Sequence, residues 1–409
     1  MSLKNKKILL IIGGGISAYK SLDLIRLFQK RNCSIKVVLT KSGKKFVTAL
    51  SISSLSKNSV FEDMFKQRKR GEIDHIQLSR WADLVLVLPT TANFMSKLSR
   101  GSAEDLASTV ILASNKPVFL VPAMNVRMWI HKATQRNFIK LIEYGYKFIG
   151  PVDGEMACGE YGKGKMSSPR QILSYLEKFF KNRNLFKKKK IKAIVTSGPT
   201  REYLDPVRFI SNESSGKQGY EIAKELSRLG IATTLISGPT NILYGNEKIE
   251  IKHVKTGNQM FEAVKKKLPA DIAICTAAVT DFRPISIKKN KIKKNTIIKE
   301  IKVEKNPDIL NFLGRSNIYK PKILVGFSAE TENVIKNSIQ KMNDKHCDMI
   351  IANDVSKKDI GFNSDFNEVA IIDKNGKSEK IKKASKKFIA SLIVKKILDK
   401  FLSHEKSLN

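Results

Sequence analysis

The sequence predicts two α/β domains in tandem, each with a doubly wound and mostly parallel sheet. The first observation behind this prediction is that the chain opens twice in the same way. An apolar run, Ile8 to Ile12 or Ile191 to Val195, is followed by a loop rich in glycine and hydroxyl groups and then by a helix. Such a unit presents free backbone N–H groups to a phosphate. The second observation is that later apolar runs are continuous in Val, Leu and Ile, which is typical of strands covered by helices on both faces.

The composition is that of a globular protein with room for two or three domains, since 42% of its 409 residues are hydrophobic. The formal net charge of +37 raises the possibility of nucleic-acid binding. The lysines are, however, spread over every predicted helix. The dense runs at 187–190 and 288–294 contain no aromatic side chain that would stack on bases. We therefore expect no nucleic-acid partner, and a basic nucleic-acid-binding protein remains the rival interpretation.

The cysteines and the amino terminus point to a cytoplasmic protein. Cys33, Cys158, Cys275 and Cys347 are widely spaced and form no Cys-x-x-Cys pair, which argues against a zinc or iron–sulfur site. The first apolar run contains five clearly apolar residues before three glycines, too few for a signal peptide or a membrane span. We expect a reduced protein without membrane contact.

The first half alternates between predicted strands and helices. Ser42 is expected to cap the second helix by accepting a hydrogen bond from a free backbone N–H group. The predicted elements are Ile8 to Ile12, Ala18 to Arg31, Ser34 to Thr40, Ser42 to about Leu55, Asp83 to Leu88 and Pro117 to Val121.

Four loops of the first half follow predicted parallel strands and therefore meet at one edge of the sheet. They span 13–17, 40–42, 89–93 and 122–125. Ligands of such sheets bind beyond the carboxyl ends of the strands. The hydroxyl and amide groups of these loops suit a phosphate, a ribityl chain or the polar edge of a flavin, although ordinary turns and caps remain the simpler alternative.

Three side chains of the first half are candidates for chemistry. His75 is either a packed core histidine or a base. Asn125 either caps a helix or binds a ligand. Cys158 lies within 154–166, where glycines are too dense for a helix or a strand, so we expect a mobile flap. A cysteine on a flap points to chemistry rather than to packing.

The motifs GISAYK (15–20), PAMNxxMW (122–129) and ACG (157–159), together with His75, resemble the flavin-dependent cysteine decarboxylase family, specifically the phosphopantothenoylcysteine decarboxylases. The resemblance covers residues 7 to 180, and its motifs are specific in combination. It implies that FMN oxidises the CH2–SH group of the substrate to a thioaldehyde, which provides the electron sink that loss of carbon dioxide requires.

The resemblance also implies residue roles. His75 would act as base or orienter, Asn125 would hold the substrate carboxylate, and Cys158 would supply a proton while reduced flavin returns a hydride. Family members place the flavin between subunits of a trimer, so His75 and Asn125 of one site would come from different chains. The FMN-binding residues are expected to be Gly15, Ile16, Ser17, Thr40, Ser42, Pro89, Thr90, Thr91, Asn93, Ser108 and Met124.

A polar, basic stretch separates the two halves. A helix is predicted from Pro169 to Lys181, and the following residues lack periodicity. We therefore divide the chain into a decarboxylase domain (1–182), a linker (183–190) and a second domain (191–409). Both domains are expected to be flavodoxin-like or Rossmann-like.

The second domain repeats the alternation of strand and helix. Asp373 to Lys377 is expected to be a turn that closes a hairpin at the edge of the sheet. The predicted strands are Ile191 to Val195, Ala232 to Ser237, Ile249 to Val254, Asp271 to Thr276, Lys322 to Gly326, Asp348 to Ala352 and Glu368 to Ile372, and the helices begin near Gly219, Gly257, 306, 331 and 384.

Three constellations of the second domain suit a triphosphate. Arginines and an amide at 201–212 adjoin the phosphate loop, the segment 276–284 leads into a lysine run, and Lys341 and Lys345 share one helical face. Each alone is most simply a solvated surface feature. A bound nucleotide would explain all three, because lysines neutralise its negative charges.

This half is similar to the phosphopantothenate-cysteine ligase family over residues 190 to 400. The matching motifs are SGPT (197–200), DPVRFISNESSGK (205–217), AAVTDFRP (277–284) with KIKK (291–294), NPDI (306–309), GFSAET (326–331) and ANDVS (352–356). The resemblance implies activation of a carboxylate by CTP as an acyl-cytidylate, which the amine of cysteine then attacks.

The second resemblance likewise assigns roles. Arg208 and Asn212 would hold the acyl-cytidylate, and Lys291 would assist amide formation or nucleotide binding. Magnesium is expected on the triphosphate, but no carboxylate cluster identifies its ligands. The CTP-binding residues are expected to be Cys275, Thr276, Ala277, Ala278, Asp281, Lys291, Pro307, Asp308, Ile309, Leu310, Phe327, Lys341 and Lys345.

The two halves together predict a bifunctional enzyme of coenzyme A biosynthesis. It would join L-cysteine to 4'-phosphopantothenate and convert the resulting 4'-phosphopantothenoylcysteine into 4'-phosphopantetheine. The alternative is that one half is active and the other is a scaffold. We expect a homo-oligomer with trimeric decarboxylase contacts and dimeric ligase contacts, up to a dodecamer.

Overall fold

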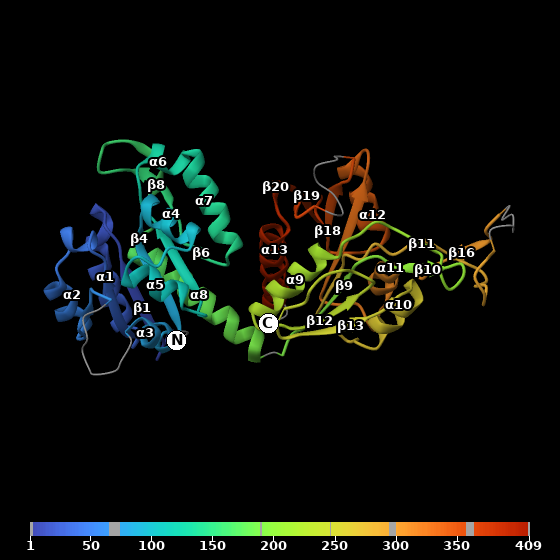
Figure 1. Ribbon diagram of the computed structural model, residues 1–409, viewed down its shortest axis with the longest axis horizontal. Helices are drawn as coiled ribbons and strands as arrows, with labels where there is room; N and C mark the ends of the chain where they lie inside the picture. The colour runs from blue at the N-terminus through green and yellow to red at the C-terminus, as the bar shows by residue number, and fades with distance from the viewer. Residues whose placement is uncertain are drawn as a thin grey trace. The chain divides into compact units, whose positions relative to one another are not determined.

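A computed structural model describes residues 3–64, 74–188, 190–245, 247–293, 300–356 and 364–407. The chain forms two compact units, Met1–Asn184 and Leu185–Asn409. Each unit has a central sheet with helices on both faces (Figure 1), which confirms the predicted fold class.

The sheet of the first unit is parallel throughout and reverses its strand order between β1 and β4. All carboxyl ends therefore lie at one edge, and the reversal creates the crevice in which such sheets bind ligands. In spatial order the strands are β3 (Val60–Phe61), β2 (Ser34–Leu39), β1 (Lys7–Ile12), β4 (Leu84–Thr90), β5 (Val118–Pro122) and β6 (Lys147–Phe148).

Alternate residues of these strands face opposite helical layers. Ile8, Leu10 and Ile12 pack on one side, and Leu9 and Ile11 on the other. The first layer contains α1 (Lys20–Gln29), α2 (Ala49–Ser56) and α8 (Pro169–Lys188); the second contains α3 (Asp74–Trp81), α4 (Ala92–Arg100), α5 (Leu106–Leu112), α6 (Val126–Ile130) and α7 (Lys132–Glu143). Short 3₁₀ turns follow β1 (η1, Ile16–Tyr19) and β2 (η2, Gly43–Lys45).

The glycine-rich segment is a hairpin, not the irregular flap expected from its composition. β7 (Val152–Glu155) and β8 (Tyr161–Lys165) pair antiparallel. The glycines are needed for close packing rather than for irregularity. A Cβ atom on Gly164 would lie 2.4 Å from the carbonyl oxygen of Met124, and one on Gly162 would lie 3.2 Å from Val126. The hairpin therefore lies directly on the loop that follows β5. We call this hairpin and its turn, residues 152–165, the flap hairpin.

Two further expectations about the first half are wrong. Ser42 caps no helix, and α2 begins later, where Thr48 accepts a hydrogen bond from the backbone N–H of Ser51 at 3.1 Å. The helix predicted to end at Lys181 is longer, because α8 continues to Lys188 and includes most residues of the predicted linker. Lysine and arginine are good helix formers, so a polar, basic run without periodicity can still extend a packed helix.

The sheet of the second unit is parallel over its first six strands and ends in an antiparallel hairpin. Asp373 to Lys377 forms the predicted turn, with Gly376 at φ 76°. In spatial order the strands are β13 (Ile249–His253), β12 (Ala232–Ser237), β9 (Lys192–Ser197), β14 (Ile272–Cys275), β17 (Ile323–Glu330), β18 (Met349–Asp354), β19 (Phe366–Asp373) and β20 (Ser378–Ser385).

Two small hairpins that the sequence did not predict stand at the carboxyl edge of this sheet. They are β10 (Arg201–Tyr203) with β11 (Phe209–Ser211), and β15 (Phe282–Pro284) with β16 (Val303–Lys305). One helical layer contains α9 (Lys217–Arg228) and α13 (Lys386–Ser407); the other contains α10 (Gly257–Lys265), α11 (Ile309–Arg315) and α12 (Val334–Asp344). No helix in the described ranges has the length and apolar character needed to span a membrane.

Candidate functional sites

The loops at the carboxyl edge of the first sheet pack backbone against backbone. A Cβ atom on Gly13 would lie 2.3 Å from the carbonyl oxygen of Pro89, and one on Gly14 would lie 2.4 Å from the Cβ atom of Ser42. Larger residues would force these loops apart. The glycines thus bring the loops after β1, β2 and β4 together, as the sequence predicts for a shared binding edge.

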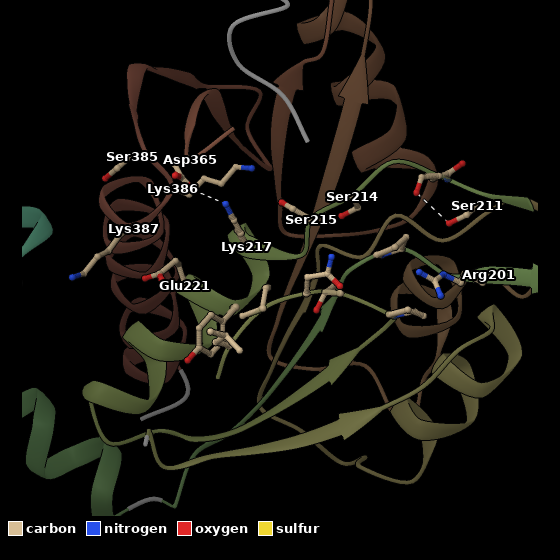
Figure 2. A pocket seen from close by; sticks show the side chains of 18 of the residues that line it. Arg201, Ser211, Ser214, Ser215, Lys217, Glu221, Asp365, Ser385, Lys386 and Lys387 are labelled. Carbon is tan, nitrogen blue, oxygen red and sulfur yellow. Dashed lines mark hydrogen bonds and ion pairs between the residues drawn. The ribbon is translucent and has the colours of Figure 1, made fainter. Parts of the chain in front are cut away.

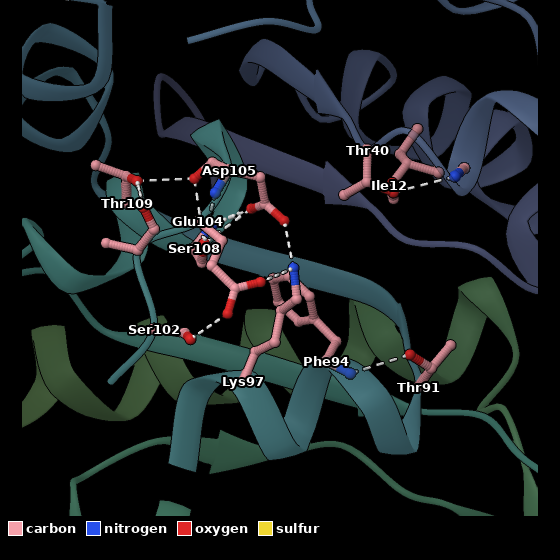
Figure 3. A network of polar contacts seen from close by, with 12 residues as sticks. Ile12, Thr40, Thr91, Phe94, Lys97, Ser102, Glu104, Asp105, Ser108 and Thr109 are labelled. Carbon is pink, nitrogen blue, oxygen red and sulfur yellow. Dashed lines mark hydrogen bonds and ion pairs between the residues drawn. The ribbon is translucent and has the colours of Figure 1, made fainter. Parts of the chain in front are cut away.

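Several predicted FMN ligands hold these loops in place. The Thr40 hydroxyl donates to the carbonyl of Ile12 at 3.0 Å, and Thr91 caps α4 by accepting from the N–H of Phe94 at 3.2 Å (Figure 3). Thr90 is fully buried, where its hydroxyl donates to the carbonyl of Val87 and accepts from a backbone N–H of β5. These threonines therefore fix the shape of the edge, and Thr90 presents no exposed surface to a ligand.

The buried Ser108 belongs to a polar network that Figure 3 shows. It forms a capping box with Asp105 at the start of α5, and Lys97 joins Asp105 and Glu104 at 3.0 Å each. The hydrogen bond that Lys97 donates to Glu104 raises the pKa of Lys97. Burial opposes the charge on Asp105, but hydrogen bonds from Ser108 and Lys97 hold the pKa of Asp105 below its usual value. Ser108 thus stabilises α5, and its full burial argues against the direct FMN contact that the sequence suggested.

Most of the remaining predicted FMN residues leave surface at the edge. Ile16 is 62% exposed, and Asn93 is exposed as well. Gly15, Ser17 and Met124 are half-buried in the same loops, whereas Pro89 is buried. The N–H of Met124 donates to the carbonyl of Gly164 in the flap hairpin. An apolar side chain beside glycine amides and hydroxyls suits a ligand with an apolar ring and a phosphate.

Asn125 lies next to Cys158, which belongs to the turn of the flap hairpin. Asn125 Oδ1 caps α6 by accepting from the N–H of Arg127 at 2.7 Å. Its Nδ2 donates to Glu160 Oε2 at 2.7 Å and lies 3.4 Å from Cys158 Sγ. The capping alternative for Asn125 is therefore confirmed, and the other side of its amide faces the flap, so ligand binding by Asn125 stays a prediction. No sequence pattern pointed to Glu160 beyond its place next to the ACG motif.

His75 lies apart from this pair. It is the second residue of α3, is half-buried, and makes no hydrogen bond to Asn125 or Cys158 among the described residues. The helix packs against α5 and β1. One chain by itself thus joins Asn125 to Cys158 but does not join either of them to His75.

The second unit has a cavity of about 860 Å³ at the start of α9 (Figure 2). Gly216 precedes the helix in a left-handed conformation, φ 72°, which glycine adopts without strain. Its carbonyl accepts from the buried Ser197 hydroxyl at 2.8 Å, so the end of β9 fixes the start of α9. Ser214, Ser215 and Asn212 line the cavity beside the helix N-terminus, where backbone N–H groups favour an anion.

Cationic side chains line this cavity as well. Figure 2 shows Arg201, Lys217 and Lys386 around it. Lys217 forms an ion pair with Asp365 at 2.6 Å. Burial, and then the charge of Lys217, lower the pKa of Lys386 to about 8. The C-terminal helix α13 therefore contributes the side chain of Lys386 to this cavity. No sequence motif indicated this contribution.

Asn212 joins the phosphate loop to the loop after β14. Its Nδ2 donates to the carbonyl of Val279 at 3.2 Å. Below it, Thr280 contacts Thr200 and Glu202, and Glu202 also accepts from the N–H of Gly257 at 2.8 Å. The buried Glu202 thereby ties together three loops of the carboxyl edge. The predicted residues Thr276, Ala277 and Ala278 are half-buried along this loop, and Asp281 is exposed.

Asp205 joins Arg208 to the lysine run. Its Oδ1 accepts from the N–H groups of Val207 and Arg208 at 2.8 Å each, and its Oδ2 accepts from the N–H of Ile292 at 3.1 Å. The guanidinium of Arg208 donates to the carbonyl of Ile292 at 2.9 Å. Burial opposes ionisation, but these donors and the nearby guanidinium lower the pKa of Asp205. The backbone of Ile292, the residue after Lys291, is consequently held beside Arg208.

The remaining predicted CTP residues divide between the two faces of the sheet. Asp308 caps α11, and its Oδ2 pairs with Lys345 Nζ at 2.8 Å. Burial, with a smaller effect of Cys347, raises the pKa of Cys275 to about 12, so this thiol stays protonated. Phe327 packs on the opposite face, against the layer of α9 and α13. Lys341 and Pro307 are half-buried, and Ile309 and Leu310, the first two residues of α11, are buried in the core.

No group of three His, Cys, Asp or Glu side chains in the described ranges is arranged to hold a metal ion.

Comparisons with known proteins identify two families along the chain. Residues 1–181 match the Flavoprotein family, and residues 188–401 match the DNA/pantothenate metabolism flavoprotein C-terminal domain. The chain is 39% identical over 401 residues to the coenzyme A biosynthesis bifunctional protein CoaBC of Haemophilus influenzae, covering 98% of this chain and 99% of the relative. It is 38% identical over 396 residues to the protein of that name from Bacillus subtilis, covering 97% of each. For the Escherichia coli K12 protein the identity is 40% over 380 residues, covering 92% of this chain and 93% of the relative.

Proposed function

The chain belongs to the family of bifunctional coenzyme A biosynthesis proteins, and we propose that its two units catalyse consecutive steps of that synthesis. Family membership confirms the predicted combination of a decarboxylase with a ligase. In the proposed order, the second unit joins L-cysteine to 4'-phosphopantothenate, and the first unit decarboxylates the product to 4'-phosphopantetheine. The observation that supports this best is the match of both halves over nearly the whole chain.

The loop edge of the first unit fits FMN. The tight glycine packing at Gly13 and Gly14 brings three loops together beside the 3₁₀ turn that follows β1, and the exposed Ile16 offers an apolar surface to a ring. Gly15, Ser17, Ser42, Asn93 and Met124 complete the proposed site, with Thr40, Pro89 and Thr91 shaping it. When bound, FMN would supply the redox chemistry that turns the thiol-bearing carbon into an electron sink for decarboxylation.

The chain's own residues bind and orient the substrate and move a proton. Asn125 holds the substrate carboxylate through Nδ2, a role supported by the carboxylate of Glu160 that this atom binds in the structure. Cys158, which is exposed on the flap, supplies a proton from Sγ. His75 acts as base or orienter from a neighbouring subunit. This is consistent with the lack of a hydrogen bond between His75 and Asn125 among the described residues of one chain. The exposed Ile16, Tyr19, Met128 and Ile130 would be covered by such an assembly.

The second unit binds CTP and 4'-phosphopantothenate at the carboxyl edge of its sheet. Asn212 and Arg208 hold the acyl-cytidylate, and Lys291 assists attack by the amine of cysteine. This arrangement is supported by the bonds that join Asn212 to Val279 and Arg208 to Ile292. Cationic side chains around the α9 cavity suit phosphate groups, and Mg²⁺ would accompany the triphosphate.

The CTP site would extend along the loop after β14 and the start of α11. Asp308, Lys341 and Lys345 lie on one face there, and Phe327 would contact the nucleotide from the other. The preference for CTP over ATP rests on the family resemblance. We also propose a homo-oligomer in the cytoplasm, in keeping with four free cysteines.

A mass-spectrometric time course tests the whole proposal. The purified protein is supplied with FMN, Mg²⁺, CTP, 4'-phosphopantothenate and cysteine. We expect CMP to appear first and 4'-phosphopantetheine afterwards. Accumulation of 4'-phosphopantothenoylcysteine would favour the alternative in which only the ligase half is active, and no turnover of CTP would contradict the proposal for the second unit.

A further inference from the structure

The flap hairpin contains a carboxylate that the proposed reaction does not use. Glu160 lies just before β8, and its Oε2 accepts a hydrogen bond from Asn125 Nδ2 at 2.7 Å. Cys158 Sγ lies 3.4 Å from the same nitrogen. The amide proposed to hold the substrate carboxylate is thus already bound to a carboxylate of the protein.

The orientation of this amide is fixed by the helix that follows it. Asn125 Oδ1 accepts from the N–H of Arg127 at 2.7 Å as the cap of α6, so Nδ2 must point away from the helix. A side-chain amide has two N–H groups. One is directed at Glu160 and the other toward Cys158, so both face the flap.

We propose that Glu160 is a positioning residue that holds Asn125 in the empty site and releases it to the substrate carboxylate. The inference rests on the proposed role of Asn125. Two carboxylates compete for one donor and repel each other, so binding of the substrate displaces Glu160.

Displacement of Glu160 also moves the turn that carries Cys158. The carbonyl of Glu160 accepts from the N–H of Met156 at 2.8 Å, which closes the turn around the cysteine. Gly159, within this turn, has φ 83°, a conformation that tolerates rearrangement at little steric cost. Binding of the substrate carboxylate is therefore coupled to the position of the thiol.

The free energy with which Glu160 competes for Asn125 depends on how strongly water screens its carboxylate. A hydrogen bond to a charged group is stronger than a neutral one, but Glu160 is exposed and water screens it. Removal of the competing carboxylate should therefore strengthen substrate binding by about 3- to 10-fold. A residue that merely supports the flap would act in the opposite direction, because its loss would weaken binding.

The test uses the full chain with FMN and measures decarboxylation of 4'-phosphopantothenoylcysteine by Glu160→Ala and Glu160→Gln. We expect KM to fall about 3- to 10-fold in Glu160→Ala and less in Glu160→Gln, which keeps a neutral acceptor. We expect kcat to change less than KM. Inhibition by 4'-phosphopantetheine should stay unchanged, because this product lacks the carboxylate. Glu155→Ala, which removes the exposed carboxylate at the other side of the same hairpin, is the matched control and should leave KM unchanged.

An unchanged or raised KM in an active Glu160→Ala protein would overturn the inference. So would an equal change in the affinities for substrate and product, since that would indicate a general opening of the flap. Absence of decarboxylation in the wild-type protein would instead contradict the proposed function, so the two failures are distinguishable.

Discussion

Substitution of Asp205 tests whether one buried carboxylate assembles the ligase site. In Asp205→Asn the amide oxygen can still accept from the N–H groups of Val207 and Arg208, but the amide nitrogen then faces the N–H of Ile292. Two donors oppose each other at 3.1 Å, and the attraction to the guanidinium is lost. The turn at 205–208 should therefore survive while the lysine run is released.

The expected effect is a loss of ligase activity without loss of decarboxylase activity. The lost interaction is charge-assisted and buried, so we expect kcat/KM for ligation to fall roughly 30- to 150-fold. The assay measures CMP release with CTP, 4'-phosphopantothenate and cysteine, and separately measures decarboxylation of supplied 4'-phosphopantothenoylcysteine. Hydrogen exchange at the amide of Ile292 should quicken at the same time.

The control is Asp344→Asn, which changes an exposed aspartate on α12 of the same unit. It should leave both activities unchanged. Ligation at the wild-type rate in Asp205→Asn would refute the reasoning, because Arg208 and Lys291 would then not need Asp205 to hold them. An equal loss of both activities would also refute it, since that would indicate general unfolding.

Three further predictions address the other parts of the chain. Cys158→Ser should halt 4'-phosphopantetheine formation while CMP release continues, and unaltered pantetheine output in the time course would remove the thiol from the mechanism. Gly14→Ala should abolish flavin absorbance of the purified protein, because the new Cβ would lie 2.4 Å from Cβ of Ser42 and push the loops apart; retained flavin would contradict the fit. The pKa of Lys386 is lowered to about 8 by burial and by Lys217, so the unfolded chain binds more protons than the folded one above that pH. Urea unfolding should therefore show wild-type stability rising relative to Lys386→Met between pH 8 and about 10, and a constant difference would contradict this.

Much of the architecture could be predicted from local patterns. Continuous apolar strands such as Ile8 to Ile12 indicate burial on both faces, and the two glycine loops indicate where helices begin. The fold class, the family and the pair of activities are confirmed. The residue-level assignments, including FMN and CTP ligands, remain proposals.

The wrong expectations share one physical origin. Glycine density at 154–166 suggested irregular backbone, but the hairpin forms because Gly162 and Gly164 must approach Val126 and Met124. Ser42 has a hydroxyl that could cap a helix, but α2 begins later in the chain and Thr48 is the residue that caps it. Local sequence preference limits the backbone conformations that a residue can adopt. Packing against distant segments decides which of these conformations it takes in the folded protein.

The sequence by itself determined most strands of the two central sheets, the glycine-rich loops that follow the first strand of each unit, and the motifs that identify the family. Only the tertiary structure decided that Glu160 binds Asn125, that Asp205 joins Arg208 to Ile292, and that α13 brings Lys386 to the α9 cavity. The reason is that strand order and register bring together residues far apart in the chain. A hydrogen bond between such residues leaves no periodic trace in the sequence, whereas burial of a strand or the start of a helix does.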